Sequence, residues 1–151
     1  MKSISLAIVG LFVSASAFAA CPDLSGTFSC AYDDGTVDQM VISQSEVKGV
    51  TTYTVNGNPI VADGVVQSLP DDAGAKNQSV SYSCDADKFK YAYSADLYEA
   101  NVMAGSVTAD LLFSKDATTG SLVVEDVGSF SLADGSVYPW ASTINCSVFT
   151  P

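Results

Sequence analysis

Three aromatic side chains, Phe89, Tyr91 and Tyr93, stand at alternate positions and would share one face of an extended strand. Near the C-terminus Tyr138 and Trp140 repeat this spacing, and Trp140 is the only tryptophan in the chain. An aromatic face of this kind suits stacking on an apolar ligand or on a sugar, so these five residues form the predicted ligand wall. Inward aromatic side chains also fill the interiors of small barrels, and core packing is the interpretation that the sequence favours for them.

Catalytic chemistry has little support in the sequence. The chain contains no histidine, which removes the Ser-His-Asp triad and the Cys-His pair. Ser45 and Lys48 have the Ser-x-x-Lys spacing, but that motif belongs at a helix start and its companion motifs are missing. Asp96 and Glu99 are carboxylates close in sequence, yet nothing in the sequence places them across a cleft. We therefore expect no enzymatic activity and no cofactor.

The charge balance narrows the possible partners. The 151 residues include 17 acidic and 6 basic side chains, for a net charge of −11, and every basic residue is a lysine. Without arginine and with few lysines, the chain is unsuited to nucleic acid and to anionic membrane surfaces. Acidic pairs such as Asp71 and Asp72 lie in predicted turns without EF-hand spacing, so we expect no metal site.

Residues 1–19 are typical of a secretory signal peptide. Lys2 precedes an uncharged, apolar segment, and Ala17 and Ala19 fit the cleavage positions, with cleavage after Ala20 as the near alternative. An uncleaved membrane anchor would need a longer apolar run, and a lipoprotein acylated on Cys21 would need a better lipobox. The sequence therefore predicts one exported domain over residues 20–151, in the periplasm or outside the cell, with no membrane contact after cleavage.

The exported part is predicted to be entirely β. Short runs rich in Val, Thr, Tyr and Phe alternate apolar and polar residues and are separated by Gly, Asp and Asn. Asn56-Gly57 is the strongest hairpin signal. The eight to ten strands pair most economically in sequence order as an antiparallel, up-and-down β-barrel of about eight strands. A two-sheet β-sandwich is the alternative. The predicted strands include 37–43, 50–55, 60–68, 89–95, 107–113, 122–127 and 137–149.

Four cysteines follow the signal segment, which predicts two disulfides in an oxidising compartment. In an up-and-down barrel the last strand pairs with the first, which brings Cys146 toward Cys21. The expected bridges are therefore Cys21–Cys146 and Cys30–Cys84. The second bridge must cross the interior, because the Cα atoms of a disulfide lie only about 5.5 Å apart. A firm Cys30–Cys84 pair would leave less room for a ligand.

The start of the exported domain, residues 21–28, resembles the opening of calycin barrels, the lipocalin and avidin group. Gly26-Thr27-Phe28 corresponds to their Gly-x-Trp motif, with Phe28 replacing the tryptophan, and the hydrophobic run Met40-Val41-Ile42 corresponds to a second strand. The resemblance implies that an apolar small molecule binds inside a barrel. The arginine that packs on the motif in lipocalins has no counterpart here, and no biotin-contacting residue is transferred.

Two functions from different classes follow from the sequence. The first is a secreted or periplasmic, non-enzymatic binding module that holds an apolar small molecule in its interior. The second is an envelope or extracellular module with a filled core that contacts a protein or a glycan through an exposed apolar or aromatic patch.

Overall fold

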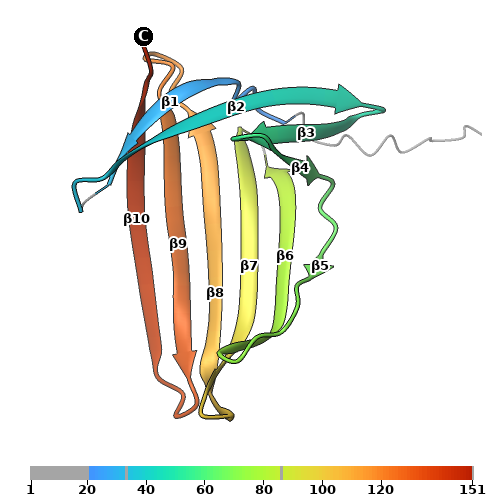
Figure 1. Ribbon diagram of the computed structural model, residues 1–151, viewed down its shortest axis with the longest axis vertical. Helices are drawn as coiled ribbons and strands as arrows, with labels where there is room; N and C mark the ends of the chain where they lie inside the picture. Colours follow the sequence, from blue (N-terminus) through green and yellow to red (C-terminus); the bar gives the residue numbers. More distant parts are fainter. Residues whose placement is uncertain (1–20, 33, 86, 151) are drawn as a thin grey trace, which may run out of the picture.

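The computed structural model describes residues 21–32, 34–85 and 87–150, so the predicted signal peptide lies outside the described residues. The regular structure of the described residues is β throughout, in one antiparallel sheet of ten strands in the order β4-β3-β2-β1-β10-β9-β8-β7-β6-β5 (Figure 1). Among the described residues no helix is long and apolar enough to cross a membrane. The strands are β1 (Gly26–Ala31), β2 (Val37–Val47), β3 (Val50–Val55), β4 (Asn58–Ala62), β5 (Gln67–Ser68), β6 (Ala75–Asp85), β7 (Lys88–Glu99), β8 (Val102–Lys115), β9 (Leu122–Leu132) and β10 (Val137–Val148).

The tight turns follow from residues that accept a left-handed backbone. Asn56 and Gly57 have φ values of 49° and 86°, as the predicted Asn-Gly hairpin between β3 and β4 requires. Lys48 and Gly49 adopt similar values of 53° and 79°. The β2–β3 hairpin is therefore equally tight, and β2 continues to Val47, beyond the predicted strand over residues 37–43.

The expectation of an all-β chain with sequential antiparallel pairing is confirmed, but the predicted closed barrel of about eight strands is wrong. The alternative two-sheet sandwich does not form either, because all ten strands belong to one sheet. The physical reason lies in the unequal strand lengths. The strands β6 to β10 have 11 to 14 residues, whereas β1 has six. β1 pairs with only three residues of β10, from Cys146 to Val148, so the sheet stays open below that junction.

The hydrophobic core lies where β1 to β4 cross the upper ends of the long strands (Figure 1). We call the side of β6 to β10 that is turned toward β1–β4 the inner face. The segment after β4 returns to β6, near the opposite edge of the sheet, where the Gly64 N–H donates to the Tyr82 carbonyl at 2.8 Å. The core is thus enclosed at the top, while the lower halves of β7 to β10 are not crossed by these strands. Its buried members are Leu24, Phe28, Cys30, Ile42, Tyr53, Phe89, Leu122, Val124 and Cys146.

Two disulfides are present, but their pairing differs from the prediction. Cys30 bonds to Cys146 and Cys21 bonds to Cys84. Cys30 and Cys146 are directly opposite residues of β1 and β10, with Cα atoms 4.1 Å apart. The expected pairing assumed that β1 runs along β10 from its first residue. Instead β1 meets β10 through its own C-terminal half, so Cys21 extends past the end of β10 and reaches across the interior to β6.

Below the junction, the edge of β10 has no neighbouring strand among the described residues. The Phe149 N–H donates to the Thr27 carbonyl at 2.9 Å, so the odd-numbered residues of this strand direct their backbone groups toward β1 and the open side. β10 pairs with β9 without a register shift, which places the Pro139 nitrogen on the same open side. A proline at this position removes a donor from an edge that no charged side chain of β10 protects.

We predict that both bridges contribute strongly to stability, because each closes a long loop, with sequence separations of 63 and 116. Replacing either pair by alanines should lower the free energy of unfolding by about 4–5 kcal/mol, as measured by chemical denaturation. Non-reducing peptide mapping should recover a Cys30–Cys146 cross-linked peptide. Recovery of Cys21 linked to Cys146 would contradict the described junction.

We predict that Pro139→Ala increases self-association, because it restores an N–H to the open edge of β10. Sedimentation velocity at increasing protein concentration should then detect a larger oligomer fraction than in the wild type. Pro70→Ala, in the loop between β5 and β6, is the matched control and should leave the distribution unchanged. Equal behaviour of the two variants would show that Pro139 does not protect the edge.

Candidate functional site

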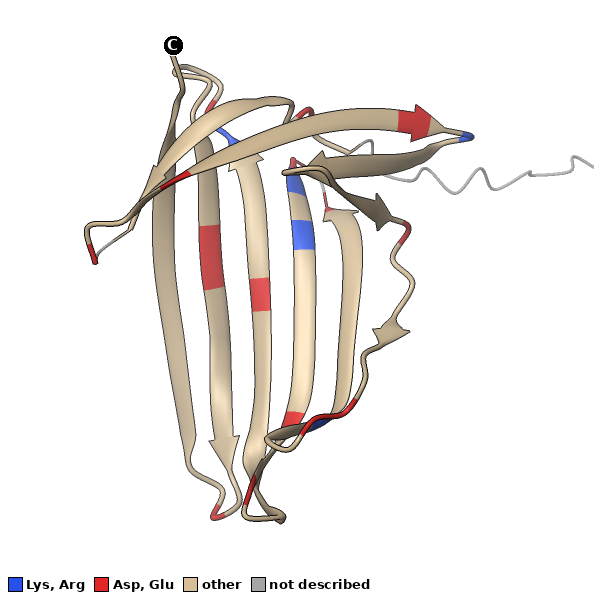
Figure 2. Cartoon of the chain, viewed as in Figure 1, with Lys and Arg blue, Asp and Glu red and all other residues tan. Residues whose placement is uncertain are grey.

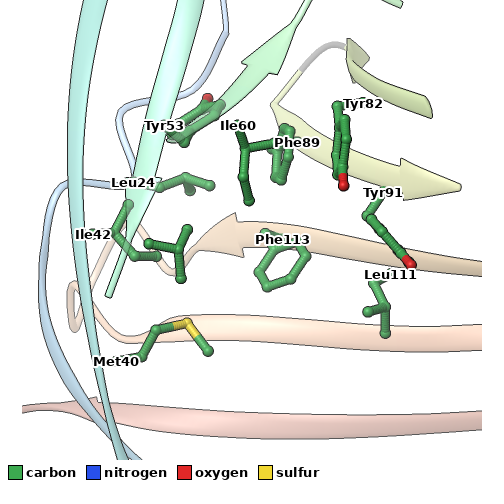
Figure 3. A pocket seen from close by; sticks show the side chains of 11 residues that line it. Leu24, Met40, Ile42, Tyr53, Ile60, Tyr82, Phe89, Tyr91, Leu111 and Phe113 are labelled. Atoms are coloured by element: carbon green, nitrogen blue, oxygen red, sulfur yellow. The ribbon is translucent and has the colours of Figure 1, made fainter. Parts of the chain in front are cut away.

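An apolar cavity of about 130 Å³ lies between the hairpins of β2–β4 and the upper parts of β6–β8 (Figure 3). Its walls come from six strands and from the segment before β1, and none of the lining side chains is charged. Period-2 alternation places them there, because every second residue of each strand faces the interior. The lining residues are Leu24, Met40, Ile42, Tyr53, Val55, Ile60, Tyr82, Phe89, Tyr91, Leu111 and Phe113.

The cavity has a closed end and an open rim. At the closed end Leu24, Ile42 and Phe89 are buried. On the opposite side Tyr91 and Leu111 are only partly buried. The cavity therefore opens toward the lower inner face, which β1–β4 leave uncovered.

Tyr53 closes the cavity from β3. Its ring is 1% exposed and lies 4.6 Å from the ring of Phe89, centroid to centroid. Its hydroxyl donates to the Pro22 carbonyl at 2.7 Å. This bond ties β3 to the segment that carries the Cys21–Cys84 bridge. Burial raises the pKa of Tyr53 well above its usual value, because the phenolate would lose its hydration.

The inner face continues below the cavity in rows of residues that are directly opposite each other. One row runs from Tyr91 through Leu111 to Asp126, and the next from Tyr93 through Ala109 and Gly128 to Trp140. Ala109 and Gly128 in the second row are small, so the middle of the inner face carries no large side chain from β8 or β9 at this level. A Cβ atom at position 128 would collide with the Trp140 ring, so the glycine allows this ring to approach the backbone of β9 closely.

Trp140 is fixed by two contacts on the inner face. Its Nε1–H donates to Asp126 Oδ1 at 3.0 Å, and its ring lies 4.7 Å from that of Phe130. Phe130 is nevertheless 43% exposed. The lower inner face therefore presents aromatic surface to solvent directly below the cavity.

The structure divides the predicted ligand wall into two parts. Phe89 and Tyr91 line the cavity. Tyr93 lies one row lower on the same face, where its hydroxyl donates to Gln78 Oε1 at 2.9 Å. Tyr138 and Trp140 are on the inner face of β10, outside the cavity, and Tyr138 is 56% exposed.

Sequence reasoning missed most of the lining. The side chains from β2, β3, β4, β6 and β8 alternate as clearly as those of β7, but alternation does not tell which face turns inward. It also missed Asp126 and Phe130, whose importance depends on the register between β8, β9 and β10. The sequence signal for Asp126 was its alternate spacing with Leu122 and Val124 on one strand, and for Phe130 its position between Ser129 and Ser131.

The other residues considered for catalysis in the sequence, Ser45, Lys48, Asp96 and Glu99, do not line this cavity. Ser45 lies within β2 and Lys48 in the turn that follows, so their spacing has no helical context. The Asp96 carboxylate accepts a hydrogen bond from the Asn77 side chain at 2.8 Å. Within the described residues, no three His, Cys, Asp or Glu side chains are grouped so that they could hold a metal ion.

Comparison of the chain with protein-family models, with curated proteins and with solved structures finds no match.

We predict that Tyr53 makes unfolding sensitive to alkaline pH. Because the pKa of Tyr53 is raised in the folded state, the contribution of this residue to the free energy of unfolding is complete below pH 10, the ordinary tyrosine pKa. This contribution is lost as the pH rises above that value. Tyr53→Phe should cost about 1 kcal/mol at pH 7 through the lost bond to Pro22, yet lose less stability than the wild type above pH 10. Urea denaturation at pH 7–11 measures both effects.

The control for this experiment is Tyr138→Phe, since Tyr138 is largely exposed. It should follow the wild-type pH dependence. If Tyr53→Phe also follows it, the Tyr53 hydroxyl is not buried in solution.

Proposed function

We propose that the protein is a non-enzymatic binding module that takes an apolar small molecule into the cavity beneath β2–β4. The observation that carries this proposal is an uncharged cavity that opens onto an uncovered aromatic face of the same sheet. A closed hydrophobic core would have filled this space with side chains. Here one end of the cavity is buried and the residues of the rim are partly exposed, an arrangement suited to ligand uptake.

The size of the cavity defines what it holds. About 130 Å³ is close to the volume of a cavity that binds benzene, and below the usual range for complete drug-sized ligands. It therefore accepts a ring or the end of an alkyl chain. The rest of a longer ligand would extend over Tyr93 and Ala109 along the lower inner face.

A second candidate function is an interaction module that contacts a protein or a glycan. The observation that favours it is the exposed aromatic surface of Phe130 and Tyr138 beside Trp140. Large exposed apolar patches on small proteins commonly mark such contacts. In this alternative the cavity is a packing defect, and a small apolar probe would not compete with the partner.

The proposed place of action is the periplasm or the extracellular space. The two disulfides support an oxidising compartment, because cytosolic thiols are kept reduced. The apolar N-terminal segment of the sequence supports export on independent grounds.

We predict that Leu111→Trp weakens probe binding by filling the cavity. Titration with N-phenyl-1-naphthylamine, followed by its fluorescence, should give a dissociation constant at least about tenfold higher than for the wild type. Leu112→Trp is the matched control, since Leu112 is the next residue of β8 and faces the opposite side. Its affinity should stay near that of the wild type.

Equal binding by the wild type and both variants would place the probe elsewhere and contradict the cavity as the site. Absence of binding to the wild type would favour the interaction module. Far-ultraviolet circular dichroism and the unfolding midpoint should be recorded for each variant, so that a loss of binding is not mistaken for a loss of structure.

A further inference from the structure

We propose that the ligand carries a cationic head, a protonated amine or a quaternary ammonium group, which binds at Asp126 while the apolar tail occupies the cavity. This inference rests on the proposed function and specifies the chemistry of the ligand. It comes from the distribution of charge around the rim of the cavity.

Asp126 lies at the open side of the cavity. It is directly opposite Leu111, a lining residue, on the same face of the sheet. Side chains of such pairs lie about 5 Å apart at Cβ, so a head group bonded to Asp126 leaves its tail at the rim. The Trp140 indole N–H binds one carboxylate oxygen and fixes the group in place. Among the described residues, no donor is bonded to the other oxygen, Oδ2.

The lysines of the described residues are all engaged or placed elsewhere. Lys88 and Lys90 pair with Glu125 and Asp110 on the outer face of the sheet. Lys115 donates to the Ser25 carbonyl at the top of the molecule. Lys76 lies over the ring of Tyr98, 4.4 Å from its centroid, and Lys48 is in the β2–β3 turn.

Figure 2 shows the same distribution along the ribbon, with the two lysines of β7 near its upper end and acidic bands on β8 and β9. Since the faces alternate along each strand, Asp126 is on the inner face, whereas Asp110 and Glu125 are on the outer face beside their lysines. The rim of the cavity therefore has a negative charge without a cationic partner among the described residues.

The aromatic surroundings favour the same charge. Tyr91, Tyr93 and Trp140 stand in the row of Asp126 and in the row below it. The faces of aromatic rings attract cations, and rings combined with a carboxylate are suited to ammonium groups. An anionic head, such as the carboxylate of a fatty acid, would meet Asp126 and a strongly acidic protein with no basic side chain to compensate.

The test compares three ligands that share an eight-carbon chain: 1-octylamine, 1-octanol and octanoate, at pH 7 and below micelle formation. Each is titrated as a competitor of N-phenyl-1-naphthylamine bound to the wild type, to Asp126→Asn and to Asp110→Asn. Asparagine retains an oxygen for the Trp140 N–H, so the site keeps its geometry. Asp110→Asn removes the same charge from the outer face and controls for the overall charge of the protein.

We expect octylamine to bind wild type about fivefold or more tightly than octanoate, a size set by the partial exposure of Asp126. Asp126→Asn should remove most of this preference, and Asp110→Asn should retain it. The inference would be overturned if octanoate bound as tightly as octylamine, or if Asp126→Asn left the preference unchanged. In either case, displacement of the probe by octanol would leave the proposed function intact. Failure of octanol to displace the probe would instead overturn the proposed function itself.

Discussion

The three-residue junction between β1 and β10, fastened by the Cys30–Cys146 bridge, determines the shape of the rest of the molecule. Because β1 crosses the end of β10 and does not run along it, the following strands are carried over the top of the long strands. This produces a covered upper half with a hydrophobic core and an uncovered lower half with one layer of sheet. The cavity, the exposed aromatic surface and the free edge of β10 are all consequences of that single crossing.

The hydrophobic core and the uncovered part of the inner face are therefore separated along the strands. The buried side chains, both disulfides and the Tyr53–Pro22 hydrogen bond are concentrated at the top, where apolar area is removed from water. Lower down on the inner face, the opposite residues Ala95 and Val107 are also buried. A face of this kind can change its contacts with a ligand without disturbing the core, because the groups that hold the fold together lie elsewhere.

In the proposed function, the charge pattern adds selectivity for the ligand to this geometry. Two of the few lysines, Lys88 and Lys90, neutralise Glu125 and Asp110 on the outer face. The inner face keeps Asp126, held by Trp140, next to the rim of an uncharged cavity. An apolar site bordered by one fixed carboxylate distinguishes ligands by the charge of their heads more than by the shape of their tails, because a buried alkyl end offers little to recognise.

The sequence by itself determined the β class, the Asn56-Gly57 hairpin, the sequential antiparallel order and the presence of two disulfides, since these depend on local alternation, turn chemistry and cysteine count. It also identified Phe89 and Tyr91 as residues that face the interior of the fold. Only the tertiary structure decided that the sheet stays open, that Cys30 bonds to Cys146, and that Asp126 stands beside Leu111. These features depend on the register and length over which distant strands pair, and register is set by the packing of the whole sheet, which no single strand encodes.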